Sequence, residues 1–210
     1  MKDYTGFVHA DGFAGFDALF EKPDVHEVAC MAHIRRKFVD VVKASGSAVA
    51  EDTVRRIAEL YAVEKEARGR PPDERVRLRQ LKAKPVFDAL ETWLASELTR
   101  ISSKSALGRA IRYALTQLPM VRPYLDHGFL ELDNNTAERA VRGIAVGRKN
   151  WLFIGSEGGG RAAAIAYTLI ETAKLNGVDP QAWLIDTFAR IADHKITKLD
   201  ELMPWRYAQT

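Results

Sequence analysis

The feature that most constrains the fold is a stretch of helical periodicity, from about Met31 to Gln117, that separates two segments of different character. Apolar residues such as Ile34 and Phe38 recur in it at helical spacing. Before it, residues 5–10 (TGFVHA) and 25–30 (VHEVAC) are short and rich in β-branched or aromatic residues, which favours strands. We therefore expect an α/β chain that is predominantly helical, with a helical block interrupting a small sheet.

Breaks within the block divide it into helices. The sequence GRPP at 69–72 ends one helix, because proline cannot continue a helix. A long helix is expected from about Asp73 to Leu98, with Pro85 kinking or dividing it. The serine-rich segment 102–105 is a natural N-cap for a further helix through Leu118.

Strand and helix signals alternate again after Pro123. The expected elements are a short strand at 128–132, an extended segment at 151–154, a glycine loop at 155–160, a helix over 161–176 that ends at Gly177, and a last helix from Asp179-Pro180 to about Ala192.

Charge and composition set broad limits on function. The net charge of +3 and the pI near 9.0 permit a nucleic-acid partner without requiring one. Single basic clusters, such as Arg35, Arg36 and Lys37, are more often solvated helix faces. The lone cysteine excludes an internal disulfide and suits the cytoplasm, and no apolar run reaches the roughly 20 residues of a membrane span.

The segment from Asp133 to Trp151, DNNTAERAVRGIAVGRKNW, carries the strongest chemical signal. Asp133 and Glu138 lie five residues apart at the start of a predicted helix. Asn135 and Glu138 have the spacing of a capping box, so a purely structural role is one interpretation. The other is a Mg²⁺ site, because this ion is usually bound by one or two carboxylates and by phosphate oxygens.

Two further motifs carry alternatives. Asp11 directly follows a predicted strand, where a carboxylate is well placed at a sheet edge, although an Asp before Gly is also a common turn. Cys30 and His33 have C-x-x-H spacing, which suggests zinc. A structural zinc site needs four ligands, and the remaining histidines are scattered, so a buried cysteine and a histidine at a helix start are favoured.

The loop GSEGGGR at 155–161 precedes a helix and offers backbone N–H groups to an anion. It lacks the Lys-Ser/Thr ending of a nucleotide-binding P-loop. Contact with a DNA phosphate, aided by Arg161, is the better use of this geometry.

Taken in order, the motifs HADGFAGF, CMAHIRRKF, the block LDNNTAERAVRGIAVGRKNWLFIGSEGGGR and DELMPW resemble the insertion sequence 66 family of bacterial transposases. The resemblance covers essentially the whole chain. It implies a ribonuclease H-like core with a DDE carboxylate triad, interrupted by an α-helical insertion. Asp11 would be the second carboxylate and Glu138 the third, and Cys30 and His33 resemble a signature that follows the second Asp in several such transposases.

The implied chemistry is DNA cleavage and strand transfer with two Mg²⁺ (or Mn²⁺) ions. The resemblance makes Asp11 and Glu138 candidate metal ligands, and the spacing of Asp133 from Glu138 makes Asp133 a further candidate. It makes double-stranded DNA, at the transposon ends and the target, the partner. Candidate phosphate contacts are Arg139, Arg142, Arg148, Lys149 and Arg161.

The resemblance also predicts the domain organisation. We expect a partial ribonuclease H-like core at 1–44, a helical insertion at 45–125, a core segment with the catalytic Glu at 126–178, and a C-terminal helix and tail at 179–210. The first Asp of the triad would lie upstream of Asp11, so we expect a truncated core that is inactive alone.

Three functional hypotheses follow. The first is part of a DDE transposase, acting as a homo-oligomer or with a full-length transposase. The second is a non-catalytic DNA-binding or regulatory remnant that pairs with a full-length transposase and would not depend on Asp11 or Glu138. The third is a helical interaction protein, whose weak DNA binding would be insensitive to salt.

Overall fold

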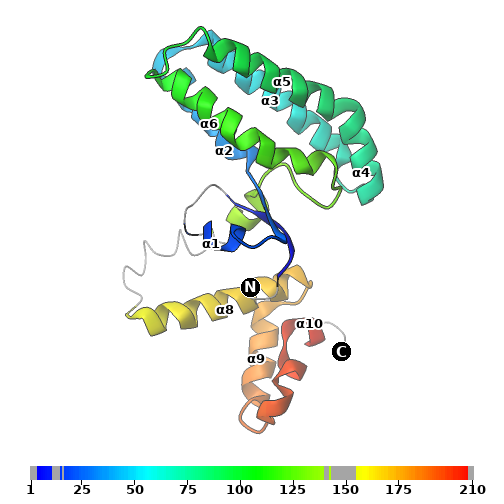
Figure 1. The fold of residues 1–210 in the computed structure, drawn as a ribbon. Helices are drawn as coiled ribbons and strands as arrows, with labels where there is room; N and C mark the ends of the chain where they lie inside the picture. The colour runs from blue at the N-terminus through cyan, green and yellow to red at the C-terminus, as the bar shows by residue number, and fades with distance from the viewer. Residues whose placement is uncertain (1–3, 11–14, 16, 140–141, 143–154, 208–210) are drawn as a thin grey trace. The chain divides into compact units, whose positions relative to one another are not determined.

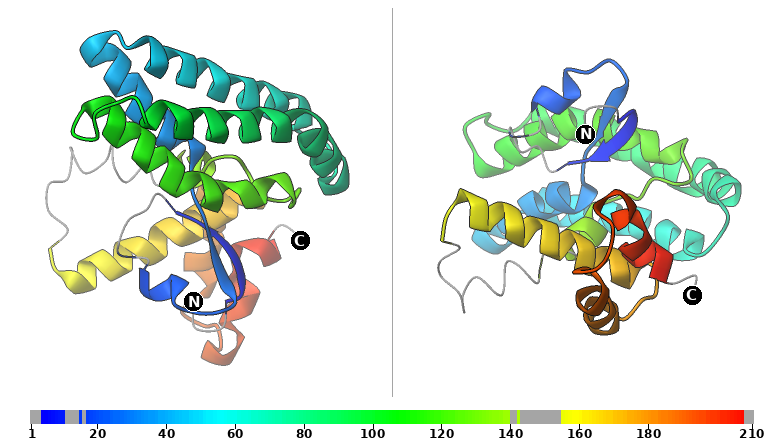
Figure 2. Two further views of the ribbon diagram at one scale, coloured as in Figure 1. Left: turned by 45° about the horizontal axis from the view of Figure 1, so that its top comes forward. Right: turned by 90° about the horizontal axis from the view of Figure 1, so that it is seen from below.

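The computed structural model describes residues 4–10, 15, 17–139, 142 and 155–207 (Figure 1; Figure 2). The chain divides into two compact units, residues 1–137 and 138–210. The described residues are mostly helical, with one small parallel sheet. None of the helices among them is both long and apolar enough to cross a membrane.

The small sheet consists of β1 (Gly6–His9) and β2 (Val25–Val28), which confirms both predicted strands. The two strands are parallel, with Gly6 opposite Val25 and His9 opposite Val28. The short helix α1 (Asp17–Phe20) lies between them in the sequence. Because the strands are parallel, His9 and Val28 lie at the same edge of the sheet, and the chain leaves that edge at both places.

Four helices form a bundle next to the sheet in the first unit (Figure 1). They are α2 (Met31–Ser45), α3 (Ala48–Ala67), α5 (Lys84–Leu98) and α6 (Ala106–Val121). Short connections make sequential neighbours antiparallel, as in other up-and-down bundles. The N-cap serines behave as predicted for α6, since the Ser105 hydroxyl accepts a hydrogen bond from the Gly108 N–H at 2.9 Å.

The long helix predicted around Pro85 is divided, as the sequence indicated. Helix α4 (Pro72–Leu78) continues into a π-helical turn, Arg79–Ala83, and then into α5. Proline has no N–H to donate and its ring crowds the carbonyl four residues back, so the wider π turn falls just before it.

A single hydrophobic core connects the sheet edge to the bundle. It extends from Val28 and Met31 through fully buried side chains such as Phe38, Phe87 and Ile111. Leu130 and Leu132 belong to the same core, so the segment before Asp133 is packed against the bundle.

The prediction of a strand at 128–132 is wrong. After a 3₁₀ turn at Arg122–Leu125 the chain forms turns and irregular structure up to the helix that starts at Asn135. The carbonyl of Leu130 accepts hydrogen bonds from arginine side chains, and the carbonyl of Leu132 accepts one from the Met31 N–H. Arginine side chains and the first N–H of α2 therefore satisfy these carbonyls in place of a neighbouring strand.

The second unit contains α8 (Glu157–Leu175), α9 (Pro180–Arg190), a 3₁₀ helix (Ile196–Leu202) and α10 (Pro204–Tyr207). Its small core includes Trp183, whose indole N–H donates to the Leu202 carbonyl at 2.8 Å.

In this unit the predicted end of one helix and the predicted start of the next are confirmed, whereas the predicted glycine loop is partly wrong. Gly177 follows α8 with φ of +69°, and the Asp179 carboxylate caps α9. Glycines 158–160 lie inside the first turn of α8, contrary to the loop prediction, because the Ser156 hydroxyl caps that helix. The extended segment predicted at 151–154 lies outside the described residues.

The described residues supply only two strands, so the ribonuclease H-like core remains a prediction. The four-part domain division predicted from the sequence also remains a prediction.

Candidate functional site

Two motifs that are far apart in the sequence meet at the sheet edge. The Cys30 sulfur, directly after β2, accepts a hydrogen bond from the Asn134 N–H at 3.5 Å. One residue further, the Met31 N–H donates to the Leu132 carbonyl at 3.2 Å. The C-x-x-H signature and the DNN sequence are therefore neighbours in the fold, although about 100 residues separate them.

Three hydrogen bonds hold the Asp133 carboxylate. The Tyr61 hydroxyl donates to Oδ2 at 2.9 Å, the Asn135 N–H donates to Oδ1 at 3.0 Å, and the Asn135 side-chain amide donates to Oδ2 at 2.7 Å. A carboxylate offers about four acceptor positions, so this arrangement leaves about one of them open. Burial, together with the Asp133 charge, raises the pKa of Tyr61, which keeps its hydroxyl protonated as a donor.

The end of β1 lies close to the same carboxylate. Burial lowers the pKa of His9, and the negative charges of Asp133 and Glu131 act in the opposite direction. Neither ring nitrogen of His9 has a hydrogen-bond partner in the described part of the chain. Asp11, two residues after His9 in the sequence, lies outside the described residues.

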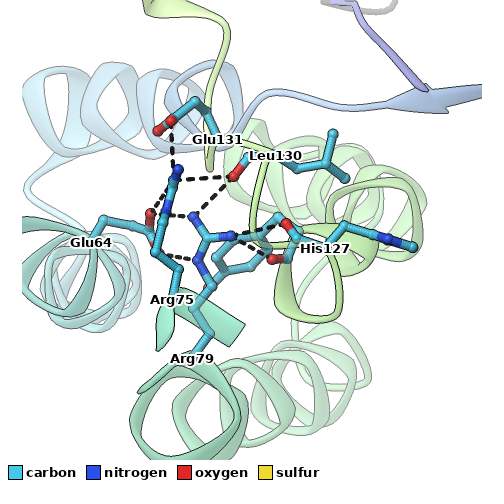
Figure 3. A network of polar contacts seen from close by, with 7 residues as sticks. Glu64, Arg75, Arg79, His127, Leu130 and Glu131 are labelled. Carbon is cyan, nitrogen blue, oxygen red and sulfur yellow. Dashed lines mark hydrogen bonds and ion pairs between the residues drawn. The ribbon is translucent and has the colours of Figure 1, made fainter. Parts of the chain in front are cut away.

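A buried arginine network holds the segment that leads to Asp133 (Figure 3). The Arg79 side chain is fully buried and forms a two-pronged ion pair with Glu64, with both N–O distances at 2.7 Å. Its guanidinium also donates to the carbonyls of Tyr124, His127 and Leu130, at 2.8, 3.2 and 2.9 Å. One side chain of the π turn thus fixes three backbone positions of the irregular segment.

A second arginine extends this network toward the DNN sequence (Figure 3). Arg75 donates to the Leu130 carbonyl at 3.3 Å and to the Glu131 carboxylate at 3.0 Å. Sequence reasoning missed both arginines and Glu64, because 15 residues and a helix break separate Glu64 from Arg79 and no local pattern marks the pair.

The helical segment 135–139 carries the second predicted carboxylate. Glu138 is half-buried one turn after Asn135, and Arg139 is exposed. The cap differs from the predicted capping box, because the Asp133 carboxylate accepts the Asn135 N–H and Asn135 is already helical. The Asp133 carboxylate therefore has a structural role, since it accepts the Asn135 N–H at the start of the helical segment.

The predicted basic contacts are spread over the second unit and the undescribed region. Arg142 is exposed, and Arg161 is exposed in α8 with a weak ion pair to Glu157 at 3.4 Å. Arg148 and Lys149 lie outside the described residues.

The zinc alternative at Cys30 and His33 gains no further ligand from the structure. Within the described residues, no three His, Cys, Asp or Glu side chains lie close enough together to hold a metal ion. Burial raises the pKa of the Cys30 thiol, which disfavours the thiolate that zinc requires.

Residues 1–162 match the family described as Transposase IS66 family, and residues 168–205 match the IS66 C-terminal element. The chain belongs to the IS66 family of transposases. The family match spans the sheet, the bundle, the DNN segment and the start of α8, and the C-terminal element runs from within α8 through α9 to the start of α10.

Curated relatives from Sinorhizobium fredii (strain NBRC 101917 / NGR234) align along 99% of the chain. The uncharacterized proteins y4hP and y4jD are each 37% identical, and the uncharacterized protein y4qI is 38% identical. The chain spans only 40%, 42% and 40% of their lengths, respectively. No solved structure matches the chain.

Proposed function

We propose that this chain forms part of a DDE transposase that cleaves DNA and transfers strands, with Asp11 and Glu138 as metal-binding carboxylates. The observation that carries the proposal is the meeting of the Cys30 segment, the end of β1 and the DNN sequence at one sheet edge. In a family whose models match both halves of the chain, this edge is the natural place for the carboxylates to converge.

The donor chemistry fits a hard divalent cation such as Mg²⁺ or Mn²⁺, because carboxylate oxygens are its preferred protein ligands. When bound, two such ions would activate the attacking oxygen and stabilise the departing one. The described residues alone hold no complete ligand cluster. Asp11 is therefore the group on which the proposed site depends.

Asp133 would act mainly as a positioning residue. Its carboxylate joins Tyr61 in the bundle to Asn135 at the start of the helical segment, and so fixes the point from which Glu138 projects one turn later. About one acceptor position remains open on this carboxylate, so it could also touch a cation at the same edge.

Double-stranded DNA is the proposed substrate. The exposed cations Arg139, Arg142 and Arg161, with Arg148 and Lys149, would contact phosphates and provide affinity that does not depend on sequence. A homo-oligomer, or a complex with a full-length transposase, is the proposed assembly.

The test is plasmid nicking by a chimera in which this chain replaces the matching two-fifths of y4jD. We expect Mg²⁺-dependent nicking that Asp11→Asn and Glu138→Gln each abolish, since either change removes a ligand charge. Asp193→Asn, at an exposed acid of the second unit, is the matched control and should nick normally. Nicking that survives both ligand changes would refute the proposal.

A second candidate function is a non-catalytic DNA-binding or regulatory module. It is favoured by the exposed cations Arg142 and Arg161, which could contact DNA phosphates without a complete metal site. Carboxylate dependence separates the two candidates. Neutralising Asp11 or Glu138 should leave the DNA affinity of a simple binder unchanged or higher, because it removes negative charge near the phosphates.

A further inference from the structure

A basic groove lies between α2 and α3 in the first unit. It encloses about 680 Å³, within the range of about 300–1,000 Å³ that ligand sites occupy. Small side chains on both helices, Ala32 on α2 and Ala58 on α3, leave room for it. The polar residues that line it are Arg35, Arg36, Asp40, Lys43, Tyr61 and Asn135.

The groove carries a net positive charge, and its cations are not paired with carboxylates of the described residues. Arg35, Arg36 and Lys43 share one face of α2, and Asp40 is the single carboxylate beside them, which leaves a local charge of +2. All three cations are exposed, and within the described residues no ion pair joins any of them to a carboxylate. The other basic residue of this cluster, Lys37, instead lies over the Tyr113 ring, 5.4 Å from its centre.

Some other cations of the same bundle pair with neighbouring carboxylates. Arg55 pairs with Asp52 and with Glu59, and Arg56 pairs with Asp52 at 2.9 Å. The cations of the groove differ from these because no carboxylate pairs with them in the described residues, and they differ from other unpaired cations because they line one hollow. Arginine is suited to a phosphate because its planar fork matches two phosphate oxygens at once.

The groove leads to the proposed catalytic edge. Tyr61 and Asn135 form its end, and both donate hydrogen bonds to the Asp133 carboxylate. Arg35 also acts electrostatically on the Tyr61 hydroxyl, so the first cation of the row lies close to this end. A polymer bound along α2 would pass directly to the DNN sequence.

The spacing of the cations fits a DNA strand. Arg36 and Lys43 are seven residues apart on one helix, which is a rise of about 10 Å. A strand of B-form DNA advances about 3.4 Å per nucleotide, so the row covers about three phosphates.

We propose that the groove formed by Arg35, Arg36 and Lys43 of α2 with Ala58 and Tyr61 of α3 binds the phosphate backbone of double-stranded DNA and directs it to the sheet edge at Asp133. This inference rests on the proposed function for the identity of its ligand. It assigns a binding role to the bundle, which family resemblance leaves without one.

The test measures the affinity of the full chain for a fluorescein-labelled 30-base-pair duplex, by fluorescence anisotropy over a range of NaCl concentrations. The variant replaces Arg35, Arg36 and Lys43 with Gln. If three phosphate contacts are lost, the slope of log K against log salt should become shallower by about 2.7. The matched control replaces Lys65, Arg68 and Arg77 with Gln; these cations are exposed and do not line the groove. This control variant should keep most of the salt dependence of DNA binding.

A second pair of variants adds charge in place of removing it. Ala58→Glu puts a carboxylate into the groove wall, and Ala62→Glu puts one on the same helix outside it. Both positions are exposed, so both proteins should fold, which circular dichroism checks. Only Ala58→Glu should weaken DNA binding and flatten the salt dependence, by about one phosphate contact.

If the slope of log K against log salt becomes equally shallow in the two triple variants, DNA is attracted by the overall positive charge and not by the groove. That result would overturn the groove assignment. Failure of the unaltered chain to bind duplex DNA would overturn it as well, and would leave an acidic protein segment as the better ligand. If the chimera nicks DNA with the expected carboxylate dependence while the groove variants bind normally, only this inference fails. If Asp11 and Glu138 prove dispensable while the groove variants lose DNA, the proposed function fails and the groove stands.

Discussion

The buried ion pair between Arg79 and Glu64 allows a direct test of what stabilises the segment that leads to Asp133. We consider Glu64→Met, which keeps a side chain of similar length and removes the charge. The Arg79 side chain is fully buried and the Glu64 side chain is 11% exposed, so the remaining guanidinium has no access to water (Figure 3). Removing one partner of a buried ion pair costs about 3–5 kcal/mol, because the other charge stays buried without compensation.

The expected effect can be measured by urea unfolding, followed by circular dichroism. With a denaturant dependence of about 2 kcal/mol per M, the midpoint should fall by about 1.5–2.5 M. Arg55→Met is the matched control. Its side chain is 63% exposed and its ion pairs with Asp52 and Glu59 are local, so its loss should cost less than about 1 kcal/mol.

The double variant separates the ion pair from the backbone contacts. Arg79→Met with Glu64→Met removes both charges, so it should cost clearly less than the sum of the two single changes. The carbonyls of Tyr124, His127 and Leu130 lose their donor in it, so stability should not return fully. Strict additivity, or a Glu64→Met cost near that of the Arg55 control, would refute the reasoning.

Three further predictions follow from single contacts. Gly128→Ala should destabilise the chain by about 1–3 kcal/mol, because a Cβ there would overlap a backbone carbonyl; an unchanged melting temperature would contradict this. Hydrogen bonds from Lys84 and then Arg122 lower the pKa of Asp88, so its contribution is present above the unfolded pKa near 3.9 and is lost as the pH falls through the lower folded pKa. Asp88→Asn should therefore be less stable at pH 7, and urea midpoints of the two proteins should converge below about pH 4; a constant difference argues against the ion pairs. The Cys30 thiol, 2% exposed and with its pKa raised by burial, should react with a thiol reagent at pH 8 only after unfolding, and rapid reaction of the folded chain would disprove its burial.

Local sequence signals predicted most of the elements correctly. The strands at the N-terminus, the serine cap of α6, the division at Pro85 and the end of α8 at Gly177 all depend on residues within a few positions of one another. The strand predicted at 128–132 failed because its pattern is also local, whereas its backbone partners are arginines more than 50 residues away.

The candidate site shows the same difference between local sequence signals and long-range contacts. The sequence marked Asp133 and the C-x-x-H signature as chemically interesting, but it had no means of showing that they meet. It also interpreted Arg35 and Arg36 as a solvated face, since only the packing of α3 against α2 turns that face into the wall of a groove.

The sequence by itself determined the family, the helical periodicity and the residue types available for metal and phosphate chemistry, because each of these depends on residue identity and spacing along the chain. Only the tertiary structure decided which groups are neighbours: Tyr61 with Asp133, Cys30 with Asn134, and Arg79 with the carbonyls before the DNN sequence. These contacts join residues 45 to 104 positions apart. They form because burial of one shared hydrophobic core, from Val28 to Leu132, brings the segments together, and the buried polar groups must then find partners where they lie.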